Sequence, residues 1–457
     1  MAKRIPRGWF LCEPCKNAAL EPPWRDFDFV AIVLSLFTEE GSFGFTTRLH
    51  RRTNPRRIGD SPVTEWIGDR MRNEYQQLTW KQCPWFQGPT FHCYRQGRFV
   101  VAELNGQHRV LSTSSRVGGM RSDIRYLVNH QSCEGAGHSM RGSFIMRLGL
   151  DGYHDSVCAE LQLNSSSVAV MGTAASMVYA AHEQATFENM QVDAIVTAGV
   201  EGNATCAGDP AQWVETPGGW SKLAEVAGTI NTIVIVNQPL KPEAQIRALL
   251  TATEGKSAAL MELGVSSRYS RDLATGTGTD QICIAAPMDE SQYAYGATNP
   301  HSKLGELLGR VTRTATRNAL RWQNGLEPSI TRSMIHALRR FGFSESAFLA
   351  ALRQRLDDAS MELLEKNRNA VLFEPQAAAA AFAFASVLDR VRFGVLPPSI
   401  GREVLRHQAA TIAASLSTQI ERWSTFWQQI VVDENQPMNA VYDAIGLGWI
   451  AKWESLG

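Results

Sequence analysis

Hydrophobic and polar positions change their spacing twice along this chain of 457 residues. Residues 1–85 show no sustained period, which predicts an irregular N-terminal extension. Residues 86–325 alternate short β-branched runs with longer segments of helical period. Residues 326–457 repeat apolar side chains at helical spacing, and prolines interrupt the pattern. The pattern therefore predicts three parts, of which the last is an all-α region.

The middle part is predicted to form a sheet covered by helices. Arg98–Leu104 and His108–Ser112 have strand-like patterns and flank Asn105-Gly106, a hairpin dipeptide, so we expect these two strands to pair. Further buried strands are expected at 168–171, 194–200, 232–237 and 281–286, and helices at 174–189, 242–264 and 302–324. The predicted fold class is α/β (α+β): a mixed β-sheet flanked by helices, followed by an all-α C-terminal region.

The composition is that of an ordinary globular protein. Hydrophobic residues make up 44% and charged residues 20%, and Lys plus Arg and Asp plus Glu are both 45. A formal net charge of zero indicates neither nucleic acid nor an anionic membrane as a partner. The apolar run Phe29–Phe37 is too short to span a bilayer, and no secretory signal is recognisable. Eight scattered cysteines are typical of reduced thiols, so we expect a cytoplasmic protein.

The segment Ala274–Asp280 (ATGTGTD) is the first candidate for chemistry. Its glycines allow a ligand to approach the backbone, and its threonines place hydroxyls beside exposed N–H groups. This composition suits an oxyanion or phosphate nest. It equally suits a tight loop whose hydroxyls satisfy its own backbone. The segment matches no common nucleotide-binding loop, because no lysine follows the glycines and a strand, not a helix, comes next.

A second candidate follows the strand expected at 194–200. Small residues and Asn203 come directly after this strand, and Asp209-Pro210 comes soon afterwards. Open sheets usually bind ligands at strand ends of this kind. Asp209 is therefore a candidate to orient an amide or to act as a base, or else it caps a turn.

Three further segments carry candidate residues. Glu254 and Lys256 are two positions apart on a predicted helix, so at most one of them points into a site. Gly255 between them either weakens that helix or marks close packing. His301 precedes a helix that Ser302 can cap, and it is a candidate general base or a structural histidine. Ser112, with Gly118-Gly119 after it, lies in a loop that lacks a nucleophile elbow but is suited to binding a ligand.

Metal-binding patterns are weak in this sequence. Cys12-x-x-Cys15 is half of a zinc ribbon without a second half at the right spacing. Neither His-Glu-x-x-His nor the cobalamin-type Asp-x-His-x-x-Gly pattern is present. No metal ligand set is predicted, no required cofactor is indicated, and metal dependence is left open.

The order of these segments resembles the adenosylcobinamide amidohydrolases of corrinoid salvage. The resemblance extends over about residues 85–315. All the blocks occur in the same order as in the family, which is improbable by chance. The matching blocks are 108–112 (HRVLS) with Gly118-Gly119, 171–177 (MGTAASM), 197–200 (TAGV) with Asn203, 207–210 (AGDP), 228–231 (GTIN), 252–254 (ATE) with Lys256, 274–280 (ATGTGTD), and His301 with 303–306 (KLGE).

The resemblance implies a reaction and a partner. Members of the family hydrolyse the amide that joins aminopropanol to adenosylcobinamide, and the product, adenosylcobyric acid, re-enters cobalamin synthesis. We therefore expect a corrinoid as the small-molecule partner. Two alternatives remain open: an amidase that acts on another amide-bearing cofactor or chelator, and a corrinoid-binding protein without catalysis.

Amide hydrolysis needs a base, an attacking group and donors for the oxyanion, and the matching blocks contain candidates for each. The expected catalytic residues are Asp209, Asp280, His301, Glu306 and Thr277, with the bases sought among Asp209, His301 and Glu306. The expected substrate-binding residues are Ser112, Gly118, Gly119, Asn203, Asn231, Glu254, Thr275, Gly276, Gly278, Thr279 and Lys303.

The two flanking parts match no family, and for the helical region we expect a role in oligomerisation or as a lid. Met71 lies shortly before the recognisable region, so we expect the native chain to start there. N-terminal sequencing of the native protein tests this expectation. An intact mass that includes residues 1–70 would contradict it.

Overall fold

The structure is a computed structural model that describes residues 80–133, 138–217, 219–222 and 228–454. Residues 1–79 of the expected N-terminal extension, with Cys12-x-x-Cys15 and Met71, lie outside the described residues, and residues 80–85 contain no helix or strand. Residues 84–457 form one compact unit.

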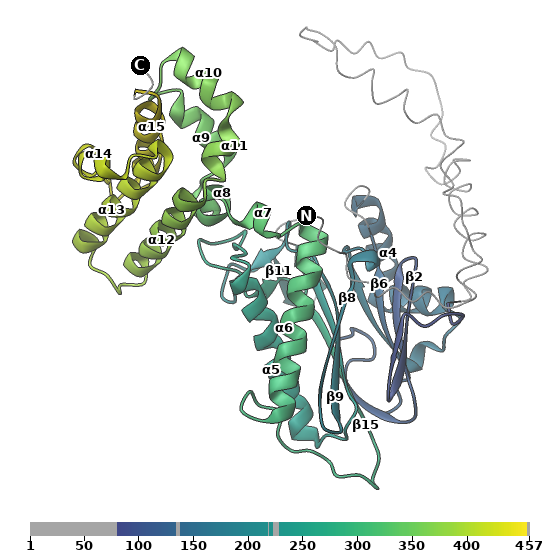
Figure 1. The fold of residues 1–457 in the computed structure, drawn as a ribbon. Helices are drawn as coiled ribbons and strands as arrows, with labels where there is room; N and C mark the ends of the chain where they lie inside the picture. The colour runs from purple at the N-terminus through teal and green to yellow at the C-terminus, as the bar shows by residue number, and fades with distance from the viewer. Residues whose placement is uncertain (1–79, 134–137, 218, 223–227, 455–457) are drawn as a thin grey trace, which may run out of the picture. The chain divides into compact units, whose positions relative to one another are not determined.

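Two β-sheets form the centre of this unit (Figure 1). The five-stranded sheet has the order β1-β2-β3-β6-β7, and the six-stranded sheet has the order β5-β4-β15-β13-β9-β8. Neighbouring strands are antiparallel except for β6 with β7 and β13 with β15, so both sheets are mixed. The strands of the first sheet are β1 (Phe86–Gly88), β2 (Phe91–Gln96), β3 (Phe99–Leu104), β6 (Tyr126–Gln131) and β7 (Val168–Thr173). Those of the second are β4 (His108–Ser112), β5 (Gly119–Arg121), β8 (Ala181–Phe187), β9 (Met190–Ala198), β13 (Ile230–Val236) and β15 (Gln281–Pro287).

Alternation along the strands creates two separate cores, because successive side chains point to opposite faces. On β13, Ile233 and Ile235 pack between the sheets against residues such as Val100 and Met171. Val234 and Val236, on the opposite face, pack beneath α5 (Pro242–Glu262) and α6 (Lys303–Asn324). On the outer side of the five-stranded sheet, α4 (His138–Glu160) contacts β7. The order of layers is helix, sheet, sheet, helices.

The strands expected at 168–171, 194–200, 232–237 and 281–286 correspond to β7, β9, β13 and β15 with shifted ends. The helices expected at 242–264 and 302–324 are α5 and α6, and Ser302 caps α6 by accepting from the backbone N–H of Gly305. The predicted fold class is confirmed. Two short pairings complete the strands: β10 (Ala204–Thr205) with β14 (Gly276–Thr277), and β11 (Trp213–Thr216) with β12 (Gly219–Lys222).

The helix predicted at 174–189 was wrong. This stretch contains a 3-10 turn at Met177–Tyr179 and then β8, which pairs along its whole length with β9. Phe187 lies opposite Met190, so two residues make the turn, and Glu188 adopts a positive φ of 52° there. Alanine and glutamate favour a helix locally, but pairing with a buried strand overrides that propensity.

The hairpin predicted across Asn105-Gly106 was also wrong in its pairing. Gly106 does adopt the left-handed conformation of a turn, with a φ of 76°. However, β3 pairs with β2 and β6, whereas β4 pairs with β15 and β5. The turn therefore carries the chain from one sheet to the other. Both sheets are mixed because each contains one parallel pair, β6 with β7 and β13 with β15.

The C-terminal part is helical, as the sequence predicts, and it has its own core. Phe348, Phe384 and Trp449 are among the fully buried side chains of this core. The helices are α7 (Pro328–Thr331), α8 (Met334–Leu338), α9 (Glu345–Leu352), α10 (Asp358–Lys366), α11 (Arg368–Leu372), α12 (Pro375–Arg392), α13 (Pro398–Ser417), α14 (Trp423–Gln429) and α15 (Met438–Glu454). Among the described residues, no helix combines the length and the apolar character that a membrane crossing requires.

Gly255 marks a close approach of α5 to α6. A Cβ at this position would lie 2.8 Å from the carbonyl oxygen of Gly309 and 3.4 Å from the backbone nitrogen of Arg313. The alternative of a weakened helix is wrong, because α5 continues through this position. Glycine is required because the neighbouring atoms belong to backbone that cannot rotate away.

Gly255→Val should therefore destabilise the fold by about 1–3 kcal/mol, the usual cost of overpacking a tight contact. Thr253→Val, at an exposed position two residues earlier, should change stability by about 0.5 kcal/mol or less. Urea denaturation of both variants measures the difference. Equal stability of the two variants would contradict the close contact.

Candidate functional site

The loop before β15 is organised around the carboxylate of Asp280. One oxygen, Oδ1, accepts hydrogen bonds from the backbone N–H of Ile230 at 3.0 Å and from the Thr277 hydroxyl at 2.5 Å. The other, Oδ2, accepts from the backbone N–H of Thr277 at 3.1 Å and pairs with the Lys256 ammonium. The side chains of Lys256 and Asp280 are 14% and 18% exposed. Asp280 therefore holds β13, α5 and its own loop together.

Gly276 makes this arrangement fit. A Cβ on Gly276 would collide with both Oδ2 of Asp280 and Nζ of Lys256. Any side chain here would separate the ion pair. Gly276 thus leaves room for the ion pair between Lys256 and Asp280. This is a structural role within the loop, as in the alternative of a tight loop that satisfies its own polar groups.

A second set of polar contacts lies next to Asp280. The exposed Thr279 places its hydroxyl against the Thr229 hydroxyl and donates to the carbonyl oxygen of Gly228 at 2.9 Å. Asn203 donates from Nδ2 to the same carbonyl at 3.0 Å, and its Oδ1 accepts from the Tyr269 hydroxyl at 3.1 Å. Gly278 abuts Asn203, since a Cβ there would lie 3.1 Å from Oδ1. Of these hydroxyl and amide groups, only the Thr279 hydroxyl belongs to an exposed residue, whereas Asn203 and Thr229 are buried beneath it.

Asp209 is held in a turn beside this loop. Its Oδ2 accepts from the Ser267 hydroxyl at 2.5 Å, the backbone N–H of Cys206 at 2.7 Å and the Thr205 hydroxyl at 3.0 Å. Burial of the carboxyl opposes ionisation, but the hydrogen bonds together outweigh burial and lower the pKa of Asp209 below its usual value of 3.8. The side chain is therefore a carboxylate at neutral pH.

A strand pairing and two hydrogen bonds of Thr275 join the Asp209 turn to the threonine-rich loop. Strand β10 pairs with β14 within that loop. The backbone N–H of Thr275 donates to the carbonyl of Thr205 at 2.9 Å, and the Thr275 hydroxyl accepts from the backbone N–H of Ala207 at 2.9 Å. The structure thus brings Asp209, Asp280, Thr275, Gly276, Thr277, Gly278, Thr279 and Asn203 to one end of the six-stranded sheet. We call this set, with Lys256, the loop cluster.

Helix α6 separates the remaining catalytic candidates from the loop cluster. Its last residue, Asn324, accepts from the backbone N–H of Val200, three residues before Asn203. Glu306 lies in the first turn of the same helix, eighteen residues earlier, which at 1.5 Å per residue is about 27 Å away. His301, Lys303 and Glu306 therefore lie at the opposite end of the sheet.

His301, Lys303 and Glu306 have the surroundings expected at the N-terminus of a helix. His301 is exposed. Glu306 pairs with Lys303 and with Arg310, and the hydrogen bond from Lys303 is the main cause of a lowered pKa for Glu306. The Lys303 ammonium also lies 4.7 Å from the centre of the Phe187 ring. The structure does not bring this group together with Asp209 or Asp280.

Two candidates lie inside the protein, not on its surface. Asn231 is fully buried between the sheets, where its Nδ2 donates to Oδ1 of Asn129 at 2.9 Å and to the carbonyl of Gly172 at 3.1 Å. Ser112 is also buried, and its hydroxyl lies 3.2 Å from the Cys283 sulfur. Burial raises the pKa of the Cys283 thiol to about 12, so this thiol stays protonated.

The two glycines after Ser112 differ in their surroundings. A Cβ on Gly118 would collide with the carbonyl oxygen of Ser114, whereas Gly119 is exposed with a φ of 81° in β5. Glycine is thus required at both positions, by space at the first and by conformation at the second.

The structure selects Lys256 from the pair on α5, because Glu254 is exposed and Lys256 binds Asp280. The sequence reasoning left Lys256 out of the expected site, together with Thr229, Ser267 and Tyr269. Two of them lie in sequence blocks that match the family: Thr229 in 228–231, and Lys256 after 252–254. Ser267 and Tyr269 had no such signal, since they reach Asp209 and Asn203 only through folding. Within the described ranges, no three or more His, Cys, Asp or Glu side chains gather as metal ligands would.

Comparison with known proteins identifies the family. The family model for adenosylcobinamide amidohydrolase matches residues 86–328, which is more than half of the chain. The chain belongs to this family. The match runs from β1 to the start of α7, so it includes the whole loop cluster, and the rest of the helical part lies beyond it.

Two individual proteins are similar to the chain. An uncharacterised protein of Methanocaldococcus jannaschii is 29% identical over 231 residues, which is 48% of this chain and 85% of that protein. A crystal structure from Pyrococcus horikoshii OT3 covers 52% of this chain and 82% of its own at 14% identity, with a TM-score of 0.25. A likeness at that TM-score bears on neither fold nor function.

Asp209→Asn should lower the free energy of unfolding more at about pH 6 than at about pH 3. Because the folded-state pKa is lowered, the ionised carboxylate stabilises the native state above the unfolded pKa of 3.8. This stabilisation is lost as pH falls through the folded pKa. Urea denaturation at both pH values measures the effect, and Ser267→Ala should show a smaller loss in the same direction. An equal loss at both pH values would contradict the assigned pKa direction.

Proposed function

We propose that the chain hydrolyses the amide that joins aminopropanol to the corrinoid in adenosylcobinamide, giving adenosylcobyric acid for cobalamin synthesis. The observation that carries the proposal is the family match over residues 86–328. The loop cluster supports it, because a carboxylate, an ammonium and several hydroxyls gather at one end of the sheet within the matched region. We expect the reaction to take place in the cytoplasm, because the cysteines are scattered in the manner of reduced thiols.

Among the three candidate bases, the geometry favours Asp209. It lies beside the threonine-rich loop, whereas His301 and Glu306 lie about 27 Å away along α6. In the proposed reaction Asp209 accepts a proton from water, and the water oxygen bonds to the amide carbon. The proton then passes to the departing nitrogen as the carbon–nitrogen bond breaks, which releases aminopropanol and leaves a carboxylic acid.

Lys256 is the proposed donor to the oxyanion. Its ammonium has three N–H groups, and Asp280 fixes its position by accepting from it. A positioned cation of low exposure stabilises negative charge that develops on the amide oxygen in the transition state. Asp280 serves as a positioning residue, since its oxygens already accept four hydrogen bonds from the protein.

Mass spectrometry of adenosylcobinamide incubated with the full chain tests the reaction. We expect adenosylcobyric acid and free aminopropanol, and a parallel sample with a chelator answers whether a metal takes part. Unchanged substrate that stays bound to folded protein would favour the corrinoid-binding alternative. Unchanged substrate without binding would favour another amide, and a panel of amides would then identify it.

Variants at the two ends of the sheet test the location of the site. Asp209→Asn and Lys256→Met should each lower kcat by about 100-fold or more, as expected for the loss of a general base or an oxyanion donor. Glu306→Gln at the far end and the exposed Asp123→Asn should keep kcat within about twofold. Circular dichroism checks that each variant folds. A loss with Glu306→Gln and none with Asp209→Asn would place the chemistry at the far end instead.

A further inference from the structure

Residues 263–272, which we call the linking segment, form one wall of the loop cluster. The Ser267 hydroxyl donates to Asp209 at 2.5 Å, and the Tyr269 hydroxyl donates to Asn203 at 3.1 Å. The backbone N–H of Arg268 donates to the carbonyl of Ala204 at 2.9 Å. Any shift of the linking segment would therefore shift the side chains that surround Asp209.

The same segment is bound on its other side by the helical region. The carbonyl of Leu263 lies 2.7 Å from Nε2 of His336, and the carbonyl of Arg271 accepts from Arg340 at 2.7 Å. Asp272 forms an ion pair with Arg392. The linking segment is thus held between the proposed site and α8 and α12.

Arg340 is well suited to hold this position. Its guanidinium binds both oxygens of Asp389 at 2.6 Å, and the side chains are only 7% and 13% exposed. A bidentate pair of this kind fixes the plane of the guanidinium. Nη1, which binds Oδ1 of Asp389, also donates to the Arg271 carbonyl, so the ion pair sets the direction of the contact between the two parts.

A cavity of about 630 Å³ opens between the linking segment and the helical region. Ser266, Ser267 and Arg268 line one side, and Ile330, His336 and Arg339 line the other. We call it the junction cavity. Its volume lies in the range of small-molecule sites. Because Ser267 both lines the cavity and binds Asp209, the cavity adjoins the loop cluster.

The lining of the junction cavity combines charged, polar and apolar groups. Glu201, Arg268 and Arg339 are exposed there and form no ion pair with any residue of the described ranges. Acceptor, donor and hydroxyl groups alternate with apolar surface from Val200 and Ile330. A corrinoid ring carries amide side chains and methyl groups around its edge, which need this mixture of acceptors, donors and apolar contacts.

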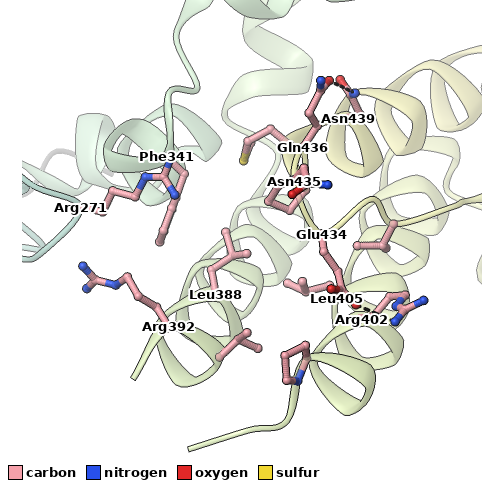
Figure 2. A pocket seen from close by; sticks show the side chains of 15 residues that line it. Arg271, Phe341, Leu388, Arg392, Arg402, Leu405, Glu434, Asn435, Gln436 and Asn439 are labelled. Carbon is pink, nitrogen blue, oxygen red and sulfur yellow. Dashed lines mark hydrogen bonds and ion pairs between the residues drawn. The ribbon is translucent and has the colours of Figure 1, made fainter. Parts of the chain in front are cut away.

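A second cavity, also of about 630 Å³, does not share these properties (Figure 2). Arg271 and Phe341 lie on one side of it, and Arg402 and Glu434 lie on the other. Arg402 is paired with Glu434, and Arg392 is paired with Asp272. Neither cavity is lined by a residue of the loop cluster, but only the junction cavity is lined by Ser267, which donates to Asp209, so the junction cavity is the one that can extend the site.

We propose that the helical region completes the substrate site, and that the amide-bearing edge of the corrinoid binds in the junction cavity while the scissile amide reaches the loop cluster. The inference rests on the proposed function. Arg268 and Arg339 are binding residues in this arrangement, and they hold the corrinoid without acting on the amide. Their loss affects binding and leaves the chemical step intact.

Steady-state kinetics and equilibrium dialysis of the full chain test the proposal. Arg268→Ala with Arg339→Ala should raise KM for adenosylcobinamide at least tenfold and leave kcat within twofold. Ile330→Trp, at a half-exposed position, should fill the cavity and have the same effect. Arg332→Ala, an exposed arginine that does not line the junction cavity, is the matched control and should leave both constants unchanged.

Dialysis against cobinamide, followed by its visible absorbance, measures binding without turnover. Weaker binding by the cavity variants than by the wild type and the control supports the proposal, even if the wild type hydrolyses nothing. Wild-type turnover with unchanged KM and binding in the cavity variants would overturn the inference and leave the proposed function standing. A wild type that neither binds nor hydrolyses the corrinoid would overturn both.

Discussion

The carboxylate of Asp280 is the point on which the geometry of the proposed site depends. It receives hydrogen bonds from the start of β13 and from Thr277, and an ion pair from α5, so three parts of the chain meet at one charged group. Ion pairs of this low exposure contribute little net stability, because desolvation offsets the attraction. Removal of one partner is costly, since the other charge stays where water reaches it poorly. The pair therefore acts mainly as a geometric constraint, which fixes Lys256 and the threonine-rich loop relative to the sheet.

The layered fold explains why only some of the polar residues of the family region lie near one another. Long helices run along the six-stranded sheet, so residues at the two ends of α6 lie at opposite ends of the molecule's central layers. Asp209 and the loop cluster occupy one end, while Glu306 and His301 occupy the other. A second polar set, around Asn231, is enclosed between the sheets, where the amide nitrogen of Asn231 donates to Asn129 and Gly172 and its Oδ1 has no partner among the described residues. The proposed chemistry is thereby confined to the end where carboxylate, ammonium and hydroxyl groups reach the surface.

The linking segment connects the helical region to the end of the six-stranded sheet where the loop cluster lies. Backbone carbonyls of the segment accept from His336 and Arg340, and its side chains bind Asp209 and Asn203 on the other face. A segment held from both sides transmits a displacement of either neighbour. The helical region lies almost wholly outside the family match, yet it contacts the segment that contains Ser267, a hydrogen-bond donor to the proposed base.

Elements that depend on local chemistry could be predicted from the amino-acid pattern alone. Buried β-branched runs gave β7, β9, β13 and β15, Ser302 marked the start of α6, and helical spacing gave the all-α region. Ordered blocks identified the family, and the same blocks contain Asp209 and the threonine-rich loop. Folding in three dimensions set the features that depend on contacts between distant residues. It made 181–187 a strand because β9 offers its hydrogen bonds, and it sent β3 and β4 to different sheets although a turn joins them. It also paired Lys256 with Asp280, and it separated His301 and Glu306 from Asp209 by the length of a helix. Spacing in a sequence records the period of one element, whereas a site is assembled from several elements whose relative positions are set only by packing.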